Sequence, residues 1–85
     1  MGVHAAVMSG QAPVVQVVVE AGTVPAGRQL RVTGHAADRS WPVRAGARVS
    51  DGGQVVLGDA LAPVNTPIVY RVTSLGELMA ASAPV

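Results

Sequence analysis

Residues 41–73 read WPVRAGARVSDGGQVVLGDALAPVNTPIVYRVT, and this stretch decides the fold. Short apolar runs alternate in it with turn residues. The run 41–45 carries the single tryptophan, 54–58 follows a Gly-Gly pair, and 68–73 has a two-residue alternation that ends in Val and Thr. Runs of this length between Gly and Pro predict β-strands. The segment 59–67 contains two prolines and predicts a corner before the strand at 68–73.

The rest of the chain continues this pattern on both sides. A β-branched run at 14–20 and an amphipathic run at 28–35 predict two further strands, joined by a Pro-Gly turn at 23–27. Gly76-Glu77 predicts a type II′ hairpin turn, because that turn has Gly at its first central position. Residues 78–85 are then a further strand, or alternatively an alanine-rich helix.

Six or seven short strands without a convincing helix predict an all-β fold, a small immunoglobulin-like or fibronectin type III-like β-sandwich. Its domain spans 14–85, and the strands end so close to the chain end that it could be the first module of a longer protein. Residues 1–13 are rich in Gly and Ala without a clear period, so we expect a flexible arm that is ordered only when something binds it.

A chain of 85 residues without cysteine can bury only a modest core, with no disulfide to support it. Val and Ala dominate its apolar residues, so the two aromatic side chains must supply much of the bulk. We expect Trp41 and Tyr70 to face each other across the sheets, with the Tyr70 hydroxyl bound to backbone at the corner. The predicted core anchors are Trp41, Tyr70, Leu30, Val32, Leu57, Ile68 and Val72.

No catalytic, cofactor or metal site is predicted, and we expect the protein not to be an enzyme. His35, Asp38 and Ser40 lie close in sequence, but nucleophilic catalysis needs an oriented base and an oxyanion site that this spacing does not provide. Gly52-Gly53 precedes a strand and therefore reads as a turn, not as a phosphate loop. Glu20 and Asp59 are expected to be solvated strand ends.

The charge pattern excludes some partners and indicates others. A formal net charge of +1 argues against capture of nucleic acid or of an anionic membrane. Arginine suits carboxylate pairing across a subunit boundary, and the run 14–20 is apolar on both faces, as expected of a covered strand or of an edge that a partner receives. The candidate interface residues are Arg44, Arg48, Arg71, Val15 and Val17. Pro42 predicts an edge position, or a strand start, for its own strand.

Several segments together resemble the opening domain of minor tail proteins from siphophages of actinobacteria. The segments are 24–27 (VPAG), 32–34 (VTG), 41–46 (WPVRAG), 53–57 (GQVVL), 59–67 (DALAPVNTP) and 70–72 (YRV). The resemblance covers about residues 14–85. Ala45 stands where the family commonly has Gly, and Val64 stands where Leu or Ile is common.

The resemblance implies a structural component of the virion, at the tail tip or along the tail, that is made in the host cytoplasm. Its partners would be other tail proteins and copies of itself, with contact to the host surface left open. The alternative is a carbohydrate- or surface-binding module of a bacterial envelope or secreted protein. In that module the loops 36–40 and 46–53 would present polar groups to the ligand.

Overall fold

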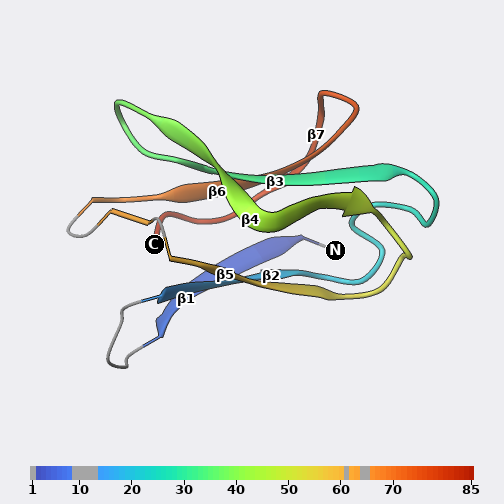
Figure 1. Cartoon of the computed structure of the whole chain (residues 1–85), viewed down its shortest axis with the longest axis horizontal. Helices are drawn as coiled ribbons and strands as arrows, with labels where there is room; N and C mark the ends of the chain where they lie inside the picture. Colours follow the sequence, from blue (N-terminus) through green and yellow to red (C-terminus); the bar gives the residue numbers. More distant parts are fainter. Residues whose placement is uncertain (1, 9–13, 61, 64–65) are drawn as a thin grey trace.

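Seven strands form two antiparallel sheets that pack face to face (Figure 1). The computed structural model describes residues 2–8, 14–60, 62–63 and 66–85. In chain order the strands are β1 (Val3–Met8), β2 (Val14–Val19), β3 (Gln29–His35), β4 (Ser40–Val49), β5 (Val55–Asp59), β6 (Val69–Ser74) and β7 (Glu77–Ala81). Within these ranges there is no helix, and hence none long and apolar enough to cross a membrane.

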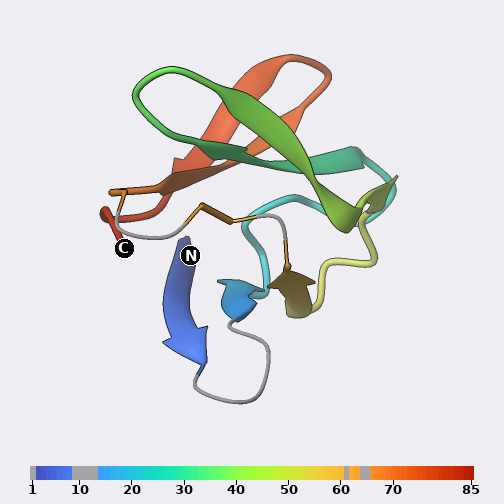
Figure 2. The same cartoon turned by 60° about the vertical axis from the view of Figure 1, so that its left-hand side comes forward.

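The strand order is that of an immunoglobulin-like sandwich. One sheet has the order β1-β2-β5 and the other β4-β3-β6-β7, and Figure 2 shows the two layers from the side. If the strands are lettered A, B, C, C′, E, F and G along the chain, the sheets are A-B-E and C′-C-F-G, with C′ added beside C as in the larger members of this architecture. The predicted small all-β sandwich is therefore confirmed.

Two-residue alternation places one row of side chains between the sheets. In β5, Val55, Leu57 and Asp59 are buried while Val56 and Gly58 are exposed. Strand β6 repeats the pattern, with Tyr70 and Val72 inside. Six predicted anchors are buried core residues, namely Leu30, Val32, Leu57, Ile68, Tyr70 and Val72, and Trp41 is partly buried against them.

The first strand corrects the prediction of a flexible arm. Residues 3–8 pair with β2 along all six positions, from Val3 opposite Val19 to Met8 opposite Val14. The Thr23 hydroxyl adds to this anchorage, because it accepts from the Gly2 amide at 3.0 Å, and the carbonyls of Glu20 (2.8 Å) and Gly2 (3.0 Å) both lie within reach of its proton. Small alanines hid the alternation of this strand in the sequence. Residues 1 and 9–13 of the expected arm lie outside the described residues.

Strand β4 is longer than predicted, because the segment expected to begin a loop at Gly46 continues as strand to Val49. The strand arches away from its neighbour midway. Pro42 lies opposite Thr33 and Ala47 opposite Arg31, so residues 43–46 face the single residue between them. Ala45 has a positive φ of 62° within this arch. The arch brings β4 toward β5 (Figure 1), and the expected edge position of this proline-bearing strand is confirmed.

The last hairpin differs from its prediction in the turn, and its strand ends at Ala81, four residues before the end of the predicted range 78–85. Leu75 and Gly76 have φ values of 50° and 83°, and Ser74 pairs with Glu77. Positive φ at both central residues indicates type I′, so the prediction of type II′ with Gly76 first was wrong. The helical alternative for 78–85 is also wrong, because Glu77–Ala81 is a strand.

Candidate functional site

A buried carboxyl group joins the two sheets. Asp59, on β5, is 1% exposed, and its Oδ2 atom accepts a hydrogen bond from Trp41 Nε1 at 2.8 Å and one from the Tyr70 hydroxyl at 2.6 Å. Both donors belong to the four-stranded sheet, on β4 and β6. Burial, together with the hydrogen bond to Asp59, raises the pKa of the Tyr70 hydroxyl far above its ordinary value, so the phenol remains a donor. We call these three residues the inter-sheet clamp.

Glycine 34 makes room for the indole of the clamp. Gly34 on β3 lies opposite Trp41 on one side and Tyr70 on the other. A Cβ atom at Gly34 would lie 2.6 Å from Cε2 and Cζ2 of Trp41, closer than such atoms can approach. The ring therefore covers the bare backbone of Gly34, and the sequence needs a glycine at this position.

The clamp corrects three sequence expectations. Asp59 is buried, whereas it was expected to be a solvated strand end. The Tyr70 hydroxyl binds a side chain and not the backbone of the corner. Trp41 and Tyr70 come from one sheet and meet at Asp59 of the other, so they do not oppose each other across the sandwich. In the sequence, an aspartate that will accept hydrogen bonds from buried donors looks the same as an aspartate at a solvated strand end. Leu61, Val64 and Asn65 of the expected corner lie outside the described residues.

A groove opens where the arch of β4 leaves β3. Its volume is 430 Å³, and it is lined by Arg31, Val32, Thr33, Ser40, Trp41, Pro42, Val43 and Ala47. Hydroxyl groups and one guanidinium stand beside apolar side chains there. Arg48 steadies the arch, because its Nε and Nη2 atoms donate to the Ala45 carbonyl at 3.2 and 3.0 Å. Gly46 lacks space for a side chain, with Val43 O only 2.9 Å from a built Cβ.

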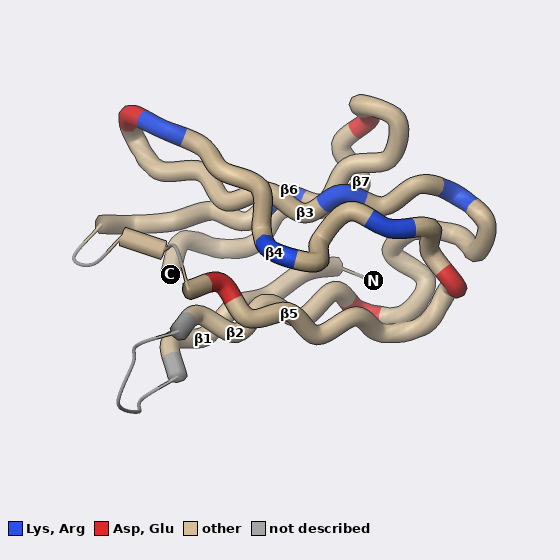
Figure 3. Tube along the Cα trace, in the orientation of Figure 1, with Lys and Arg blue, Asp and Glu red and all other residues tan. Residues whose placement is uncertain are grey.

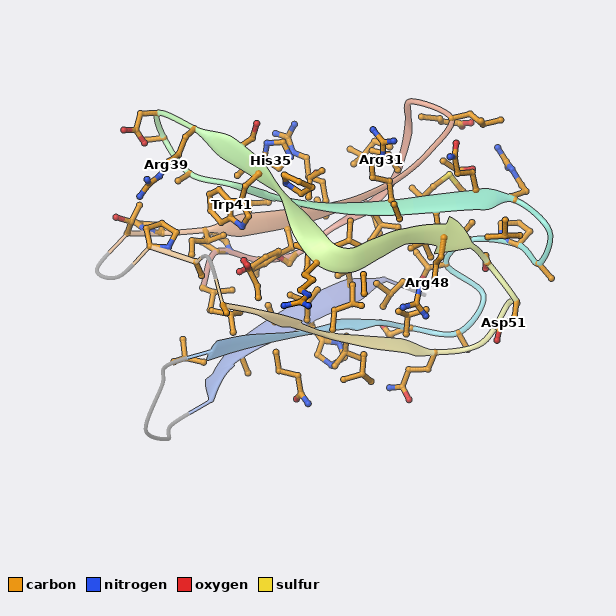
Figure 4. All side chains as sticks on the ribbon, in the orientation of Figure 1. Arg31, His35, Arg39, Trp41, Arg48 and Asp51 are labelled. Atoms are coloured by element: carbon orange, nitrogen blue, oxygen red, sulfur yellow. The ribbon has the colours of Figure 1, made fainter. Side chains whose placement is uncertain are left out.

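The outer face of the four-stranded sheet is cationic, and it also carries the exposed apolar side chains of Val49 and Leu78. Arg71 lies opposite Thr33, and Arg31 lies opposite Thr73, so two arginines stand diagonally on neighbouring strands. Figure 4 shows Arg31 and His35 pointing away from the three-stranded sheet. The His35 ring is within 2.8 Å of the Thr33 hydroxyl through Nε2. Partial burial, followed by the Arg71 charge, lowers the pKa of His35.

The outer face of the three-stranded sheet is uncharged over its described side chains. Alternation and register place on it His4, Ala6, Gln16, Val18, Val56 and Gly58. Val56 is 53% exposed, while Val18 is buried without belonging to the core cluster. All six arginines of the chain lie on the four-stranded sheet or beside its strands, and Figure 3 shows none on β1, β2 or β5. This division could not be predicted from the sequence, because it depends on which strands share a sheet.

The predicted interface residues divide into two groups. Arg44, Arg48 and Arg71 are exposed and free to meet a partner, apart from the bonds that Arg48 makes within the arch. Val15 and Val17 are buried in the core, at 6% and 0% exposure, so their placement at an interface was wrong. Their strand has neighbours on both edges, which also removes it as an edge for a partner strand. The run 14–20, which is apolar on both faces, indicates a central strand.

Among the described residues, no side-chain hydrogen bond links His35 to Ser40 or Asp38. His35 lies opposite Ser40 across β3 and β4, but the hydrogen bond of its ring goes to Thr33. Across the described ranges, no group of three or more His, Asp or Glu side chains could hold a metal ion. The searches with known proteins add nothing to this geometry, since no family model, curated protein or solved structure matches the chain.

Proposed function

We propose that this protein is a structural component of a bacteriophage tail, a minor tail or tail-tip protein that assembles through the surfaces of its sandwich. The observation that carries the proposal is the division of its surface. One outer face is uncharged over its described side chains, while the opposite face carries Arg31 and Arg71, and the other four arginines lie on or beside the strands of that same sheet. Two unlike faces on one rigid sandwich suit a subunit placed between unlike neighbours. The resemblance of residues 14–85 to minor tail proteins supplies the class of particle.

Each face has its own partner chemistry. The uncharged face, with Val56 at its surface, suits an apolar surface of a neighbouring tail subunit. Arg31 and Arg71 stand on the other face, where an acidic neighbour could be bound through paired carboxylates. The clamp between the faces keeps the sheets in one relative position, because its three side chains bridge them. The function is then mechanical and needs no reaction centre.

Mass spectrometry of density-purified virions tests the assignment. We expect the chain in particles at a fixed ratio to the other tail proteins. Its presence in the infected cell and absence from the particle would refute a structural role in the tail.

A pair of matched variants tests the docking face. Val56→Asp charges the uncharged face, and Leu75→Asp places the same charge at the exposed turn of the β6–β7 hairpin, outside both faces. Loss of incorporation is expected only for V56D, because a carboxylate at an apolar contact lacks a partner. Equal incorporation of V56D and wild type would contradict the use of this face.

The groove favours a second candidate, a carbohydrate-binding module. Trp41 lines the groove beside Arg31, Thr33 and Ser40, and an aromatic ring with polar neighbours is suited to a sugar. Trp41 is the only tryptophan, so its fluorescence reports directly on this groove. A saturable change with cell-wall oligosaccharides that is lost in Arg31→Ala would favour this candidate over the tail assignment. No change is expected if the protein is a tail component.

A further inference from the structure

The four sheet edges of the sandwich differ in how well they are protected. On β4, Pro42 has no amide hydrogen and the arch interrupts the strand. On β7 the register shifts, and Glu77 places a charge at the start of the strand. The arch of β4 lies against β5. Charge, proline, irregular pairing and covering are the devices by which proteins protect an edge.

Strand β1 has no charged residue, proline or register shift, and its contacts beyond β2 are with β6 and β7 of the facing sheet. Its sequence, VHAAVM, contains no Arg, Asp, Glu, Pro or Gly, and its register with β2 runs without a shift. It is the outermost strand of its sheet, as Figure 2 shows. An uncharged, regular edge of this kind is a template for another strand.

The backbone phase of β1 shows which residues would form the new ladder. The Gly2 carbonyl accepts a hydrogen bond from the Glu20 amide at 2.8 Å, so the groups of Gly2 face β2. Antiparallel pairing alternates from residue to residue, which turns the amides and carbonyls of Val3, Ala5 and Val7 toward the free edge. These three residues are centred on Ala5.

From this placement we infer that β1 pairs antiparallel with β1 of a second copy, about a two-fold axis at Ala5. Ala5 then faces Ala5 of the other copy, and Val3 faces Val7 in both directions. No like charges meet, because the strand carries none, whereas self-pairing of β4 would bring Arg44 and Arg48 of two copies together. This pairing deepens the proposed function and rests on it, by naming a second copy as one neighbour in the tail.

The exposure of Val7 favours β1 of a second copy as the strand that pairs here. Val7 lies on the same face of β1 as the buried Val3 and the half-buried Ala5, yet it is 64% exposed. The two-fold pairing places Val3 of the second copy beside it on that face, and apolar cross-strand pairs of this kind stabilise a sheet. The two three-stranded sheets become one six-stranded sheet whose outer face continues the uncharged face across the axis.

Sedimentation of the purified chain, with two matched lysine variants, tests the pairing. The wild type should form a concentration-dependent dimer. Val7→Lys should weaken it about tenfold or more, since an ammonium group would lie opposite Val3 without a partner. Val49→Lys, a similarly exposed valine on the other sheet, should leave the dimer unchanged. A chain that stays monomeric at every concentration, or a dimer weakened equally by both variants, would overturn the inference.

Cysteine cross-linking tests the register, because the natural chain has no cysteine. Ala5→Cys should form a disulfide-linked dimer on mild oxidation. His4→Cys should not, because His4 lies opposite Ala6 of the other copy. Strand geometry places the Cα atoms of the two residues at position 4 roughly 8 Å apart, beyond the limit of about 7 Å for a disulfide. Equal cross-linking of both variants would overturn the register.

The outcomes for the tail and for the edge are separable. A chain found in virions that neither dimerises nor cross-links at residue 5 refutes the edge pairing and leaves the tail assignment. A chain that pairs through β1 but is absent from virions refutes the tail assignment and leaves the edge pairing.

Discussion

At the scale of single residues, the three side chains of the inter-sheet clamp contribute strongly to the stability of the sandwich. Asp59 offers one oxygen to two donors from the opposite sheet, and it has further polar contact beyond these two. Sequence reasoning could choose Trp41 and Tyr70 as anchors, because they are the only large aromatic side chains available. It could not find Asp59, because a carboxyl group is normally solvated and only the tertiary fold supplies the buried donors.

Removing the carboxyl group should destabilise the sandwich strongly. Asp59→Ala leaves the Trp41 and Tyr70 donors buried without this acceptor, at an expected cost of about 3–6 kcal/mol for two charge-assisted hydrogen bonds. Asp59→Asn retains an acceptor oxygen and should lose less. Urea denaturation followed by circular dichroism gives both values, and equal stability of the wild type and the Ala variant would contradict the clamp.

Adding one methyl group at Gly34 should displace the indole. A Cβ at this site would overlap Trp41 at 2.6 Å, so Gly34→Ala should cost about 1–3 kcal/mol by overpacking. Because Trp41 is the only tryptophan, a shift of its emission maximum reports the movement directly. In a Trp41→Phe background the cost of G34A should shrink, and an unchanged cost there would assign it to backbone strain instead.

A buried hydroxyl near the last turn should be dispensable. Ser74 is 1% exposed, and among the described atoms its Oγ has no hydrogen-bond partner. Ser74→Ala removes a polar group that is desolvated without compensation, and we expect a gain of about 1 kcal/mol in unfolding free energy. Thermal denaturation measures it, and a loss of similar size would show that the hydroxyl is satisfied in solution.

At the scale of elements, periodicity located strands well wherever an alternation or a β-branched run was long. The ranges 14–20, 28–35, 54–58 and 68–73 each differ from the observed strands by one residue at most at either end. The predicted strand 78–85 extends four residues beyond the observed end at Ala81, and two other failures have separate causes. Val3–Met8 has small side chains that give little contrast between faces, and β4 continues through an arch whose glycine and alanine resemble a loop.

The arch of β4 holds a residue with a side chain in a conformation that favours glycine. Ala45 has a φ of 62°, a region in which side chains are disfavoured. Arg48 donates to the carbonyl of this residue and holds the arch in place.

The β6–β7 hairpin should accept a residue better suited to its turn. Leu75 is 79% exposed at a φ of 50°, directly before Gly76. Asn-Gly is the preferred pair for a type I′ turn, so Leu75→Asn should stabilise the protein by about 0.5–1 kcal/mol. Leu75→Val, which is β-branched, is the matched control and should destabilise it. If the two variants melt at the same temperature, the type I′ assignment is wrong.

At the scale of the whole molecule, the two sheets differ in what they expose as well as in what they bury. The residues of either face could be read from the sequence, but their gathering on separate sheets could not, because strand order is a tertiary property. The buried interior is small and has no disulfide. The stability of such a sandwich therefore responds visibly to single titrating groups.

Acidification should weaken the fold through His35. Its pKa in the folded state is lowered from 6.5, by partial burial first and by Arg71 second. Its contribution is complete above pH 6.5 and is lost as the pH falls below that value, because the unfolded chain takes up the proton first. Urea denaturation from about pH 8 to about pH 5 measures the effect. His35→Asn should flatten this part of the profile and Arg71→Gln should reduce it, whereas an unaltered profile in H35N would assign the loss to other groups.

All six arginines lie on or beside the strands of one sheet, where only Asp38 and Glu77 offset them, while Glu20 and Asp59 belong to the other sheet, so the sandwich is an electric dipole that points across its thickness. A molecule of this kind approaches a negatively charged solid, such as mica, with its cationic layer first. Single particles on such a support should therefore all land the same way up, and added salt should randomise them.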